Sequence, residues 1–271
     1  MRQGIEAMKS TSGSHIYASP FQDQLPAPLF YRAETMLADS CYPEHSHRWG
    51  EFVYSFCGVM EVKLANNHFI APPPYGVWLP PGTLHVGQNR DATSYCSVYI
   101  SAEYLQTLPQ NPCILAVNPL MRSILEYLRD QFQGLPLQAE DQRLLLALRD
   151  QLARAECAGS YLPDTEDPLL APVLRQLRDN PGDNRSLAAF ASAVNTAERT
   201  LIRRCKQELG MTFTEWRQRL RIMAALSLLS EGQTVENIAL DLGYSSASAF
   251  IVMFRKLMGM TPDEFRKGQG R

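Results

Sequence analysis

The stretch HSHRWGE, residues 45–51, carries side chains that could bind a metal ion. Two histidines stand two positions apart, and a glutamate follows four positions after the second. Further along the chain, the run LPPGTLH places another histidine behind a Pro-Pro-Gly turn. Imidazole nitrogens and carboxylate oxygens suit a divalent transition metal such as Ni, Zn, Fe, Mn or Co. The sequence therefore predicts one metal site made of His45, His47, Glu51 and His85.

The expected geometry of this site depends on β-strands. Side chains alternate along a strand, so His45 and His47 are expected to share one face. Glu51 keeps the same parity if the strand runs on unbroken, although Gly50 could insert a bulge. His85 is expected to begin a separate strand after its turn.

The spacing of these residues resembles the paired motifs of cupins, which are small β-barrels that hold a divalent metal with three histidines and one glutamate. It reads HxHxxxE up to Gly58, then PxG, His85 and Asn89. The resemblance covers about residues 38–100, and Asp39 stands where the motif usually begins with glycine. It implies a pocket that holds a metal. A metal-free pocket for a small organic effector remains the alternative.

The segments around these residues favour a β-rich domain followed by two helices. VYSFC, MEVKL, YGVWLP and SYCSVYIS are short, rich in β-branched and aromatic residues, and separated by turn residues, as in a small antiparallel barrel. Apolar residues then recur three and four apart in residues 120–132 and 139–156, which predicts a helical hairpin. Its apolar stripe could pack inside the protomer or against a second copy, so a homodimer through residues 120–156 is possible.

From residue 169 onward the pattern is helical. A short helix, a tight turn and a longer helix occur twice, which is typical of two helix-turn-helix units, and one long helix that ends at Gly232 lies between them. Ser186 and Thr234 are the expected N-caps of the two short helices. Because the Ala197 side chain cannot accept a hydrogen bond, Thr196 is left as the candidate cap of the longer helix in the first unit.

The longer helix of each unit has a face suited to DNA. In the first, basic and apolar residues at i, i+3, i+4 and i+7 share one side, which could contact guanine edges and phosphates in the major groove. In the second, the outward face is small and apolar, as suits thymine methyl groups, with two basic residues nearer the backbone. The predicted DNA contacts are Arg199, Ile202, Arg203, Lys206, Ala247, Ser248, Ile251, Val252, Arg255 and Lys256.

Charge and composition agree with this division. Residues 1–169 hold 18 Asp and Glu against 11 Lys and Arg, whereas residues 170–271 hold 10 against 15. The second part is therefore the one expected to meet a polyanion. Six scattered cysteines without a CxxC pair, no long apolar run and no apolar segment after the N-terminal charges predict reduced thiols, no membrane span and a cytoplasmic location.

The final hundred residues resemble the AraC/XylS family of bacterial transcription regulators. The matching segments are LAAFASAVNTAERTLIRRCKQELGMTFTEWRQRLR and IALDLGYSSASAFIVMFRKLMGMTPDEFR, within roughly residues 170–268. The resemblance implies two recognition helices set into successive major grooves. The base-reading positions that it implies are Arg199, Ile202, Arg203, Ala247, Ser248, Ile251 and Val252. The sequence departs from the family where Ala197 replaces a usual serine and Val252 an often basic residue.

The predicted fold class is α+β, with a cupin-like antiparallel β-barrel and helical hairpin ahead of an all-α domain. The predicted parts are a flexible tail (1–28), a sensor domain (29–157), a linker (158–168) and a double helix-turn-helix domain (169–268). The predicted function is regulation of transcription at double-stranded promoter DNA, modulated by a metal or small effector in the barrel, and the protein is not an enzyme. The alternative is a metal-dependent cupin enzyme, a dioxygenase or isomerase, with an appended helical domain.

Overall fold

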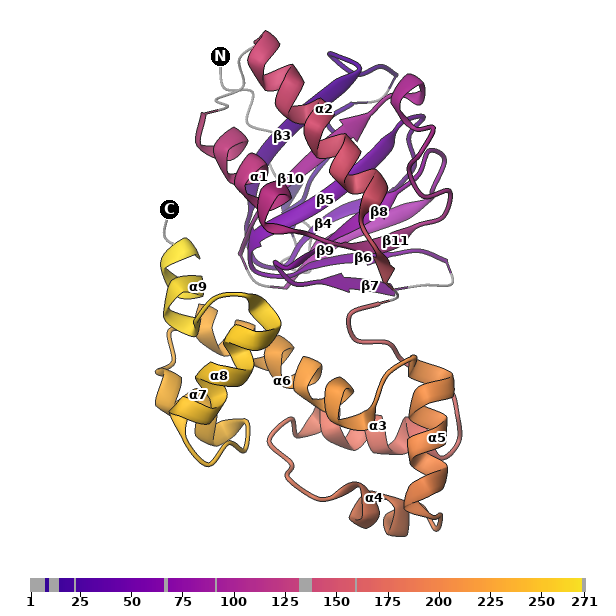
Figure 1. The fold of residues 1–271 in the computed structure, drawn as a ribbon, viewed down its shortest axis with the longest axis vertical. Helices are drawn as coiled ribbons and strands as arrows, with labels where there is room; N and C mark the ends of the chain where they lie inside the picture. The colour runs from indigo at the N-terminus through magenta and orange to yellow at the C-terminus, as the bar shows by residue number, and fades with distance from the viewer. Residues whose placement is uncertain are drawn as a thin grey trace. The chain divides into compact units, whose positions relative to one another are not determined.

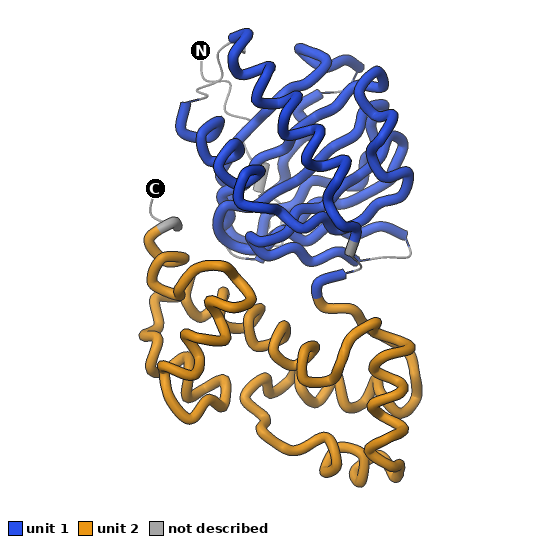
Figure 2. The backbone as a smooth tube through the Cα atoms, in the orientation of Figure 1, with its two compact units in different colours: residues 1–161, 271 blue, residues 162–270 orange. Residues whose placement is uncertain are grey.

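The computed structural model of the chain describes residues 8–9, 15–21, 23–65, 68–90, 92–131, 138–158 and 160–269. These residues form two compact units that meet between Tyr161 and Leu162 (Figure 2). The division lies inside the segment 158–168 that was predicted to be a linker. Among the residues that the structure describes, no helix is both long enough and apolar enough to cross a membrane.

Unit 1 contains two six-stranded sheets and a helical hairpin (Figure 1). Sheet A has the order β1 (Met8–Lys9), β2 (His15–Ile16), β4 (Ser40–His45), β9 (His85–Asn89), β6 (Met60–Lys63) and β7 (His68–Ala71). Sheet B has the order β12 (Cys157–Ala158), β11 (Cys113–Ala116), β8 (Tyr75–Leu79), β5 (Gly50–Cys57), β10 (Thr93–Ile100) and β3 (Leu29–Met36). The pairings are antiparallel apart from β2 with β4, so the antiparallel β-architecture predicted for this unit is confirmed.

Strand β5 of sheet B is buried on both faces, and the alternation of its side chains explains how. On β5, Phe52 and Tyr54 belong to the apolar core shared with the hairpin, whereas Glu51 and Val53 line a cavity on the other face. All eight residues of β5 are buried, and Glu51 and Ser55 are its two polar side chains. The same sheet therefore supports the hairpin on one side and positions the candidate site on the other.

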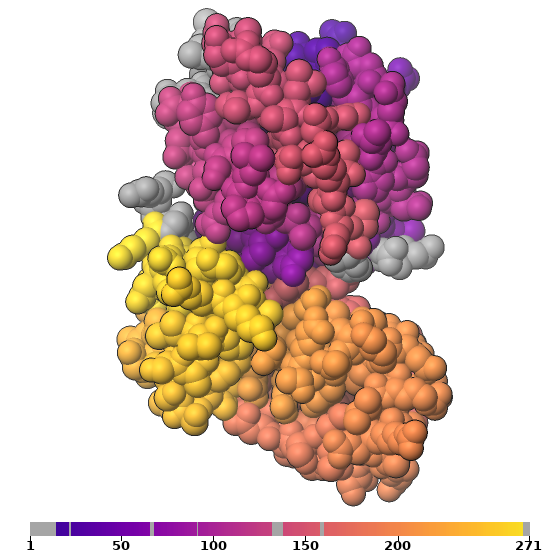
Figure 3. Space-filling view, in the orientation of Figure 1, coloured from indigo at the N-terminus to yellow at the C-terminus, as the bar shows by residue number. Residues whose placement is uncertain are grey.

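The helical hairpin consists of α1 (Pro119–Gln131) and α2 (Ala139–Arg154), close to the predicted ranges. Its apolar stripe packs on sheet B within the same chain, and the hairpin covers the face of the unit that is turned toward the viewer (Figure 3). The buried members of the stripe are Met121, Ile124, Leu125, Leu128, Leu145, Leu148 and Leu152. Phe132, the last residue of the range 120–132 predicted for the first helix, lies outside the described residues.

The prediction of a flexible tail over residues 1–28 is wrong for residues 15–21. Strand β2 pairs with β4 in this segment, and the Tyr17 side chain is buried. The Phe21 ring makes an edge contact with the Trp49 ring, with 6.4 Å between the centroids. The buried Tyr17 side chain and the half-buried Phe21 ring hold the segment against the barrel.

Unit 2 is helical, as predicted. Its helices are α3 (Leu170–Asp179), α4 (Leu187–Ala193), α5 (Glu198–Leu209), α6 (Phe213–Ser230), α7 (Val235–Asp241), α8 (Ala247–Met258) and α9 (Pro262–Gln269). The pairs α4–α5 and α7–α8 are the two helix-turn-helix units, and α6 joins them. Part of the predicted linker packs on this unit, because Asp167 accepts the Leu170 N–H at the start of α3 and Pro163 accepts the Trp216 indole N–H.

The N-caps predicted at Ser186 and Thr234 are confirmed, because each side-chain oxygen accepts the N–H three residues on, at the starts of α4 and α7. Thr212 and Ser246 cap α6 and α8 in the same way. The expected cap at Thr196 is wrong. The N-cap of α5 is Ala197, which makes no side-chain capping bond, so α5 starts one residue later than a Thr196 cap would allow.

Candidate functional site

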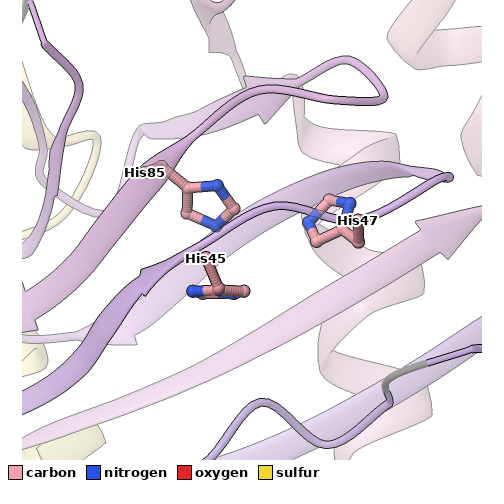
Figure 4. A group of neighbouring side chains, drawn as sticks. All are labelled: His45, His47 and His85. Atoms are coloured by element: carbon pink, nitrogen blue, oxygen red, sulfur yellow. The ribbon is translucent and has the colours of Figure 1, made fainter.

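The four predicted metal ligands lie together inside unit 1. His45 and His85 are cross-strand partners on β4 and β9, and their ring centroids lie 4.3 Å apart. One ligand nitrogen from each of His45, His47 and His85 lies within 4.8 Å of the other two, and Figure 4 shows the three rings grouped together. Glu51 Oε2 lies 3.0 Å from His47 Nε2 and 3.8 Å from His85 Nε2.

The strand geometry predicted for this group is wrong, although its members are brought together. β4 ends at His45 in sheet A and β5 begins at Gly50 in sheet B, so His47 lies in the connection between the sheets. Glu51 therefore approaches from the opposite sheet rather than from the same strand. Gly50 permits this crossing, because a Cβ atom there would lie 2.3 Å from the Trp78 ring.

Backbone carbonyls orient all three imidazole rings. Each Nδ1 atom lies at hydrogen-bond distance from a carbonyl two residues away, in the pairs His45–Pro43 (2.8 Å), His47–Trp49 (2.7 Å) and His85–Thr83 (2.9 Å). A carbonyl oxygen can only accept, so each Nδ1 must carry the proton. In the neutral rings the Nε2 lone pairs are then left to bind a metal, as is usual for histidine ligands. The donor set therefore fits a divalent ion.

Glu51 and His47 shift the pKa of each other in opposite directions. Burial raises the pKa of the Glu51 carboxyl, but the hydrogen bond and the charge of His47 outweigh burial and lower this pKa to about 2. Burial lowers the pKa of His47, but the hydrogen bond to Glu51 and its negative charge raise it above the ordinary value. For His85, burial dominates and the pKa is lowered. Glu51 thus stays ionised at neutral pH, and its negative charge favours the protonated form of the His47 ring.

A small cavity surrounds these four residues. Its free volume is about 40 Å³. This is enough for roughly one to three water molecules, since one water needs about 10–15 Å³ on this measure. The walls come from both sheets and from the segment at residues 19–21, and the further lining residues include Tyr42, Trp49, Val53, Met60, Tyr95 and Tyr99.

Two parts of this lining were not predicted. Residues 19–21 were assigned to the tail, and no motif marks them beyond the aromatic ring of Phe21. Tyr42 and Tyr95 place their hydroxyl oxygens 2.8 Å apart at the cavity wall. Tyrosines on strands are equally expected as core residues, so nothing in the sequence distinguishes these two.

In unit 2, α5 presents the face that was predicted for DNA. Arg199, Arg203 and Lys206 are exposed, and the Ile202 side chain is 54% exposed. On the opposite side, Leu201 and Cys205 are fully buried. An isoleucine this exposed between basic residues suits a surface that is covered when a partner binds.

On α8, the outward positions are partly as predicted. The most exposed apolar side chain is Val252, at 70%, and the other exposed residues are Ser248, Arg255 and Lys256, while Ala247 and Ile251 are half-buried. Phe250 and Phe254 fill the core. Ala249 is exposed as well, because it lies one turn before Val252 on the same face.

Comparisons with known proteins identify the same two units. A family model for the AraC-like ligand-binding domain matches residues 27–163, and a helix-turn-helix domain model matches residues 190–268. The chain is 30% identical over 223 residues to the HTH-type transcriptional regulator NimR of Escherichia coli (strain K12), covering 82% of this chain and 81% of that protein. It is also 30% identical over 262 residues to the HTH-type transcriptional activator RhaS of Escherichia fergusonii, covering 87% and 91%.

Among solved structures, ToxT from Vibrio cholerae matches 89% of this chain and 99% of its own, with 12% identity and a TM-score of 0.38. The two relatives of high coverage are both named as HTH-type transcriptional regulators or activators, and the two domain models match consecutive parts of this chain. This chain belongs to the AraC family of transcriptional regulators.

Proposed function

We propose that this regulator binds a divalent transition metal through His45, His47, Glu51 and His85, and that the occupied site changes its affinity for promoter DNA. The observation that carries the proposal is the convergence of the three histidine rings, each fixed by a carbonyl at Nδ1. Three imidazoles and one carboxylate suit Ni, Zn, Fe, Mn or Co. A bound ion would supply a Lewis acid with coordination positions open to water or a small ligand.

The size of the cavity supports a metal over a larger organic effector. About 40 Å³ of free space accommodates an ion with a few waters, whereas pockets for drug-sized molecules measure roughly 300–1,000 Å³. An organic effector would therefore have to displace part of the wall, such as residues 19–21. The alternative of a metal-dependent enzyme is set aside, because the relatives of high coverage are transcriptional regulators.

The proposed DNA contacts follow from the exposed faces of α5 and α8. We assign base contacts to Arg199, Ile202 and Arg203 on α5, and Lys206 adds a positive charge beside them. On α8, contacts to thymine methyls and base edges come from Ala247, Ser248, Ile251 and Val252, and phosphate contacts come from Arg255 and Lys256.

We also propose a homodimer formed through the hairpin. Because its apolar stripe is buried within the chain, the contact would use the opposite face, where Leu120, Tyr127 and Leu146 are exposed. Sedimentation of the wild type should then give a dimer, and Tyr127→Glu should shift it toward the monomer without lowering the melting temperature. A wild type that sediments as a monomer at micromolar concentration would exclude this dimer.

Elemental analysis of the purified full-length protein tests the metal site. We expect close to one equivalent of a transition metal in the wild type, and much less in His45→Ala and His85→Ala, because each variant removes one imidazole ligand. His68→Ala is the matched control, since His68 lies on the same barrel but bonds Glu61 on a different strand. Equal metal content in the wild type and His85→Ala would refute the site, whereas the DNA-binding assignment would stand.

A further inference from the structure

Arg221 is a buried charged residue near the middle of α6, with 6% of its surface exposed. Its Nε atom donates to Pro181 O at 2.9 Å, and its Nη2 atom donates to Asp183 O at 3.1 Å and Asn184 Oδ1 at 2.9 Å. The guanidinium carbon also lies 5.2 Å from the centre of the Tyr244 ring. Burying a guanidinium is unfavourable unless its donors are satisfied, so these contacts hold the α3–α4 loop on α6.

The same loop contacts the turn of the second helix-turn-helix unit. Asn184 Nδ2 donates to Gly243 O at 2.6 Å, and Gly243 has a positive φ of 74°. A Cβ atom on Gly182 would lie 2.2 Å from Asp241 O, and one on Gly243 would lie 2.3 Å from Gly182 O. The two backbones therefore touch directly, at a distance that excludes any side chain at either glycine.

We propose that Arg221 is a positioning residue that fixes the two helix-turn-helix units relative to each other, and so sets the spacing of the two DNA segments that they read. We call Gly182, Asn184, Arg221 and Gly243 the interlobe clasp. The loop belongs to the first unit because it leads into α4, and the turn belongs to the second because it joins α7 to α8. Arg221 contacts both. The inference rests on the assignment of α5 and α8 as the DNA-reading helices.

The clasp has a consequence for specificity. One inserted base pair separates two half-sites by about 3.4 Å more and rotates one against the other by roughly 35°, since a turn of duplex spans 34–36 Å and 10–10.5 base pairs. A protein whose two reading helices are fixed cannot follow this change, so it loses the contacts of one unit. A protein that flexes at the clasp can follow it, and its discrimination between spacings falls.

The test uses the full-length chain and a duplex that this chain selects from a random library. A second duplex carries one extra base pair between the two protected half-sites. We expect the wild type to bind the second duplex at least about tenfold more weakly, as for the loss of one or more base contacts. Arg221→Ala should bind the selected duplex more weakly than the wild type does. Its affinities for the two duplexes should differ by no more than about twofold.

Two further variants keep the result interpretable. Asn184→Ala removes an exposed loop side chain and its bond to Gly243, so it should fold normally and still lower the discrimination. Arg219→Ala is the control on the same helix, because its bond to Glu215 lies within α6, and it should retain the wild-type ratio. If Arg221→Ala and Asn184→Ala both keep the wild-type ratio of affinities for the two duplexes, the proposal is overturned. A wild type that selects no duplex would instead contradict the DNA-reading assignment itself.

Discussion

Glu61 is a nearly buried carboxylate on β6, away from the proposed metal site. It accepts hydrogen bonds from His68 Nε2 (3.1 Å) and Gln88 Nε2 (2.9 Å), and its second oxygen lies 2.9 Å from Arg90 Nε. Burial raises the pKa of this carboxyl, but the bonds from His68 and Gln88 and the charge of Arg90 lower it to about 2. Glu61 therefore links three strands of sheet A as an ionised group.

The Glu61→Gln variant should lose about 1–3 kcal/mol of unfolding free energy at pH 7, because it replaces charge-assisted hydrogen bonds with neutral ones. A carboxyl whose pKa is lowered by folding stabilises the protein above its unfolded pKa of about 4.5, and this contribution disappears as the pH falls toward 2. Urea denaturation should thus show a smaller difference in unfolding free energy between the wild type and Glu61→Gln at pH 3 than at pH 7. An equal difference at pH 7 and pH 3 would contradict the stabilising role of the ionised Glu61. As a control, Glu103→Gln changes an exposed carboxylate and should alter the unfolding free energy by less than about 0.5 kcal/mol.

At this scale the sequence predicts which residues form the candidate site but not how they meet. The types and spacing of His45, His47, Glu51 and His85 suffice to identify the group. Their geometry depends on the end of β4 and on Gly50, where the chain passes between sheets. That crossing arises from tertiary packing against Trp78, which no local pattern encodes.

Among the elements, the hairpin allows a matched test of burial. Leu148 and Leu146 are two residues apart on α2, but Leu148 is fully buried against sheet B and Leu146 is exposed. Leu148→Ala should destabilise unit 1 by about 2–5 kcal/mol, because it removes buried methyl groups and leaves a cavity. Leu146→Ala should change stability by less than about 0.5 kcal/mol. Thermal unfolding checks both, and similar losses in the two variants would show that the stripe is not the core face.

For α5, we expect Arg203→Ala to weaken operator binding by about 1–3 kcal/mol and to relax specificity at one base pair, as for the loss of an arginine–guanine contact. Lys256→Ala on α8 should weaken binding to all sequences alike and reduce its salt dependence, because it removes a phosphate contact. Fluorescence anisotropy on the selected operator and its single-base variants measures both effects. Unchanged affinity in Arg203→Ala would remove this residue from the interface.

Helices were easier to predict than strands. Periodicity and capping residues locate α1, α2 and both helix-turn-helix units to within a few residues. By contrast, the segment SCYPEH forms β4 although it contains a proline and a glutamate, because β9 pairs with it from a distant part of the chain. Strand formation there depends on a partner rather than on local propensity.

At the scale of the whole molecule, an acidic unit and a basic unit share one chain. If the metal changes the DNA affinity by some factor, thermodynamic linkage requires that DNA change the metal affinity by the same factor. We therefore expect operator affinity measured with and without the metal to differ by about 5–150-fold, and metal affinity measured with and without operator to differ equally. The His45→Ala variant should show neither effect. If the wild type binds the operator with the same affinity in the presence and absence of the metal, the site has no regulatory role.

The division into two units could be anticipated from charge and from the change of period, but the course of residues 15–21 could not. The segment is short and carries no strand pattern, and its docking depends on where Tyr17 and Phe21 find apolar surface. Such contacts join segments that are far apart in the sequence and lack a regular hydrophobic pattern. They can therefore be identified only from the folded barrel.

The placement of Glu51 on one sheet and of His45 and His85 on the other has a mechanical consequence. An ion bound by all of them would join the two walls of the barrel as a cross-link. By mass action its contribution to folding grows with the logarithm of the free ion concentration, reaching about 2.7 kcal/mol at a hundred times the dissociation constant. The barrel would then stiffen whenever the cell accumulates the ion, so that its resistance to heat or proteolysis would report the concentration of free ion.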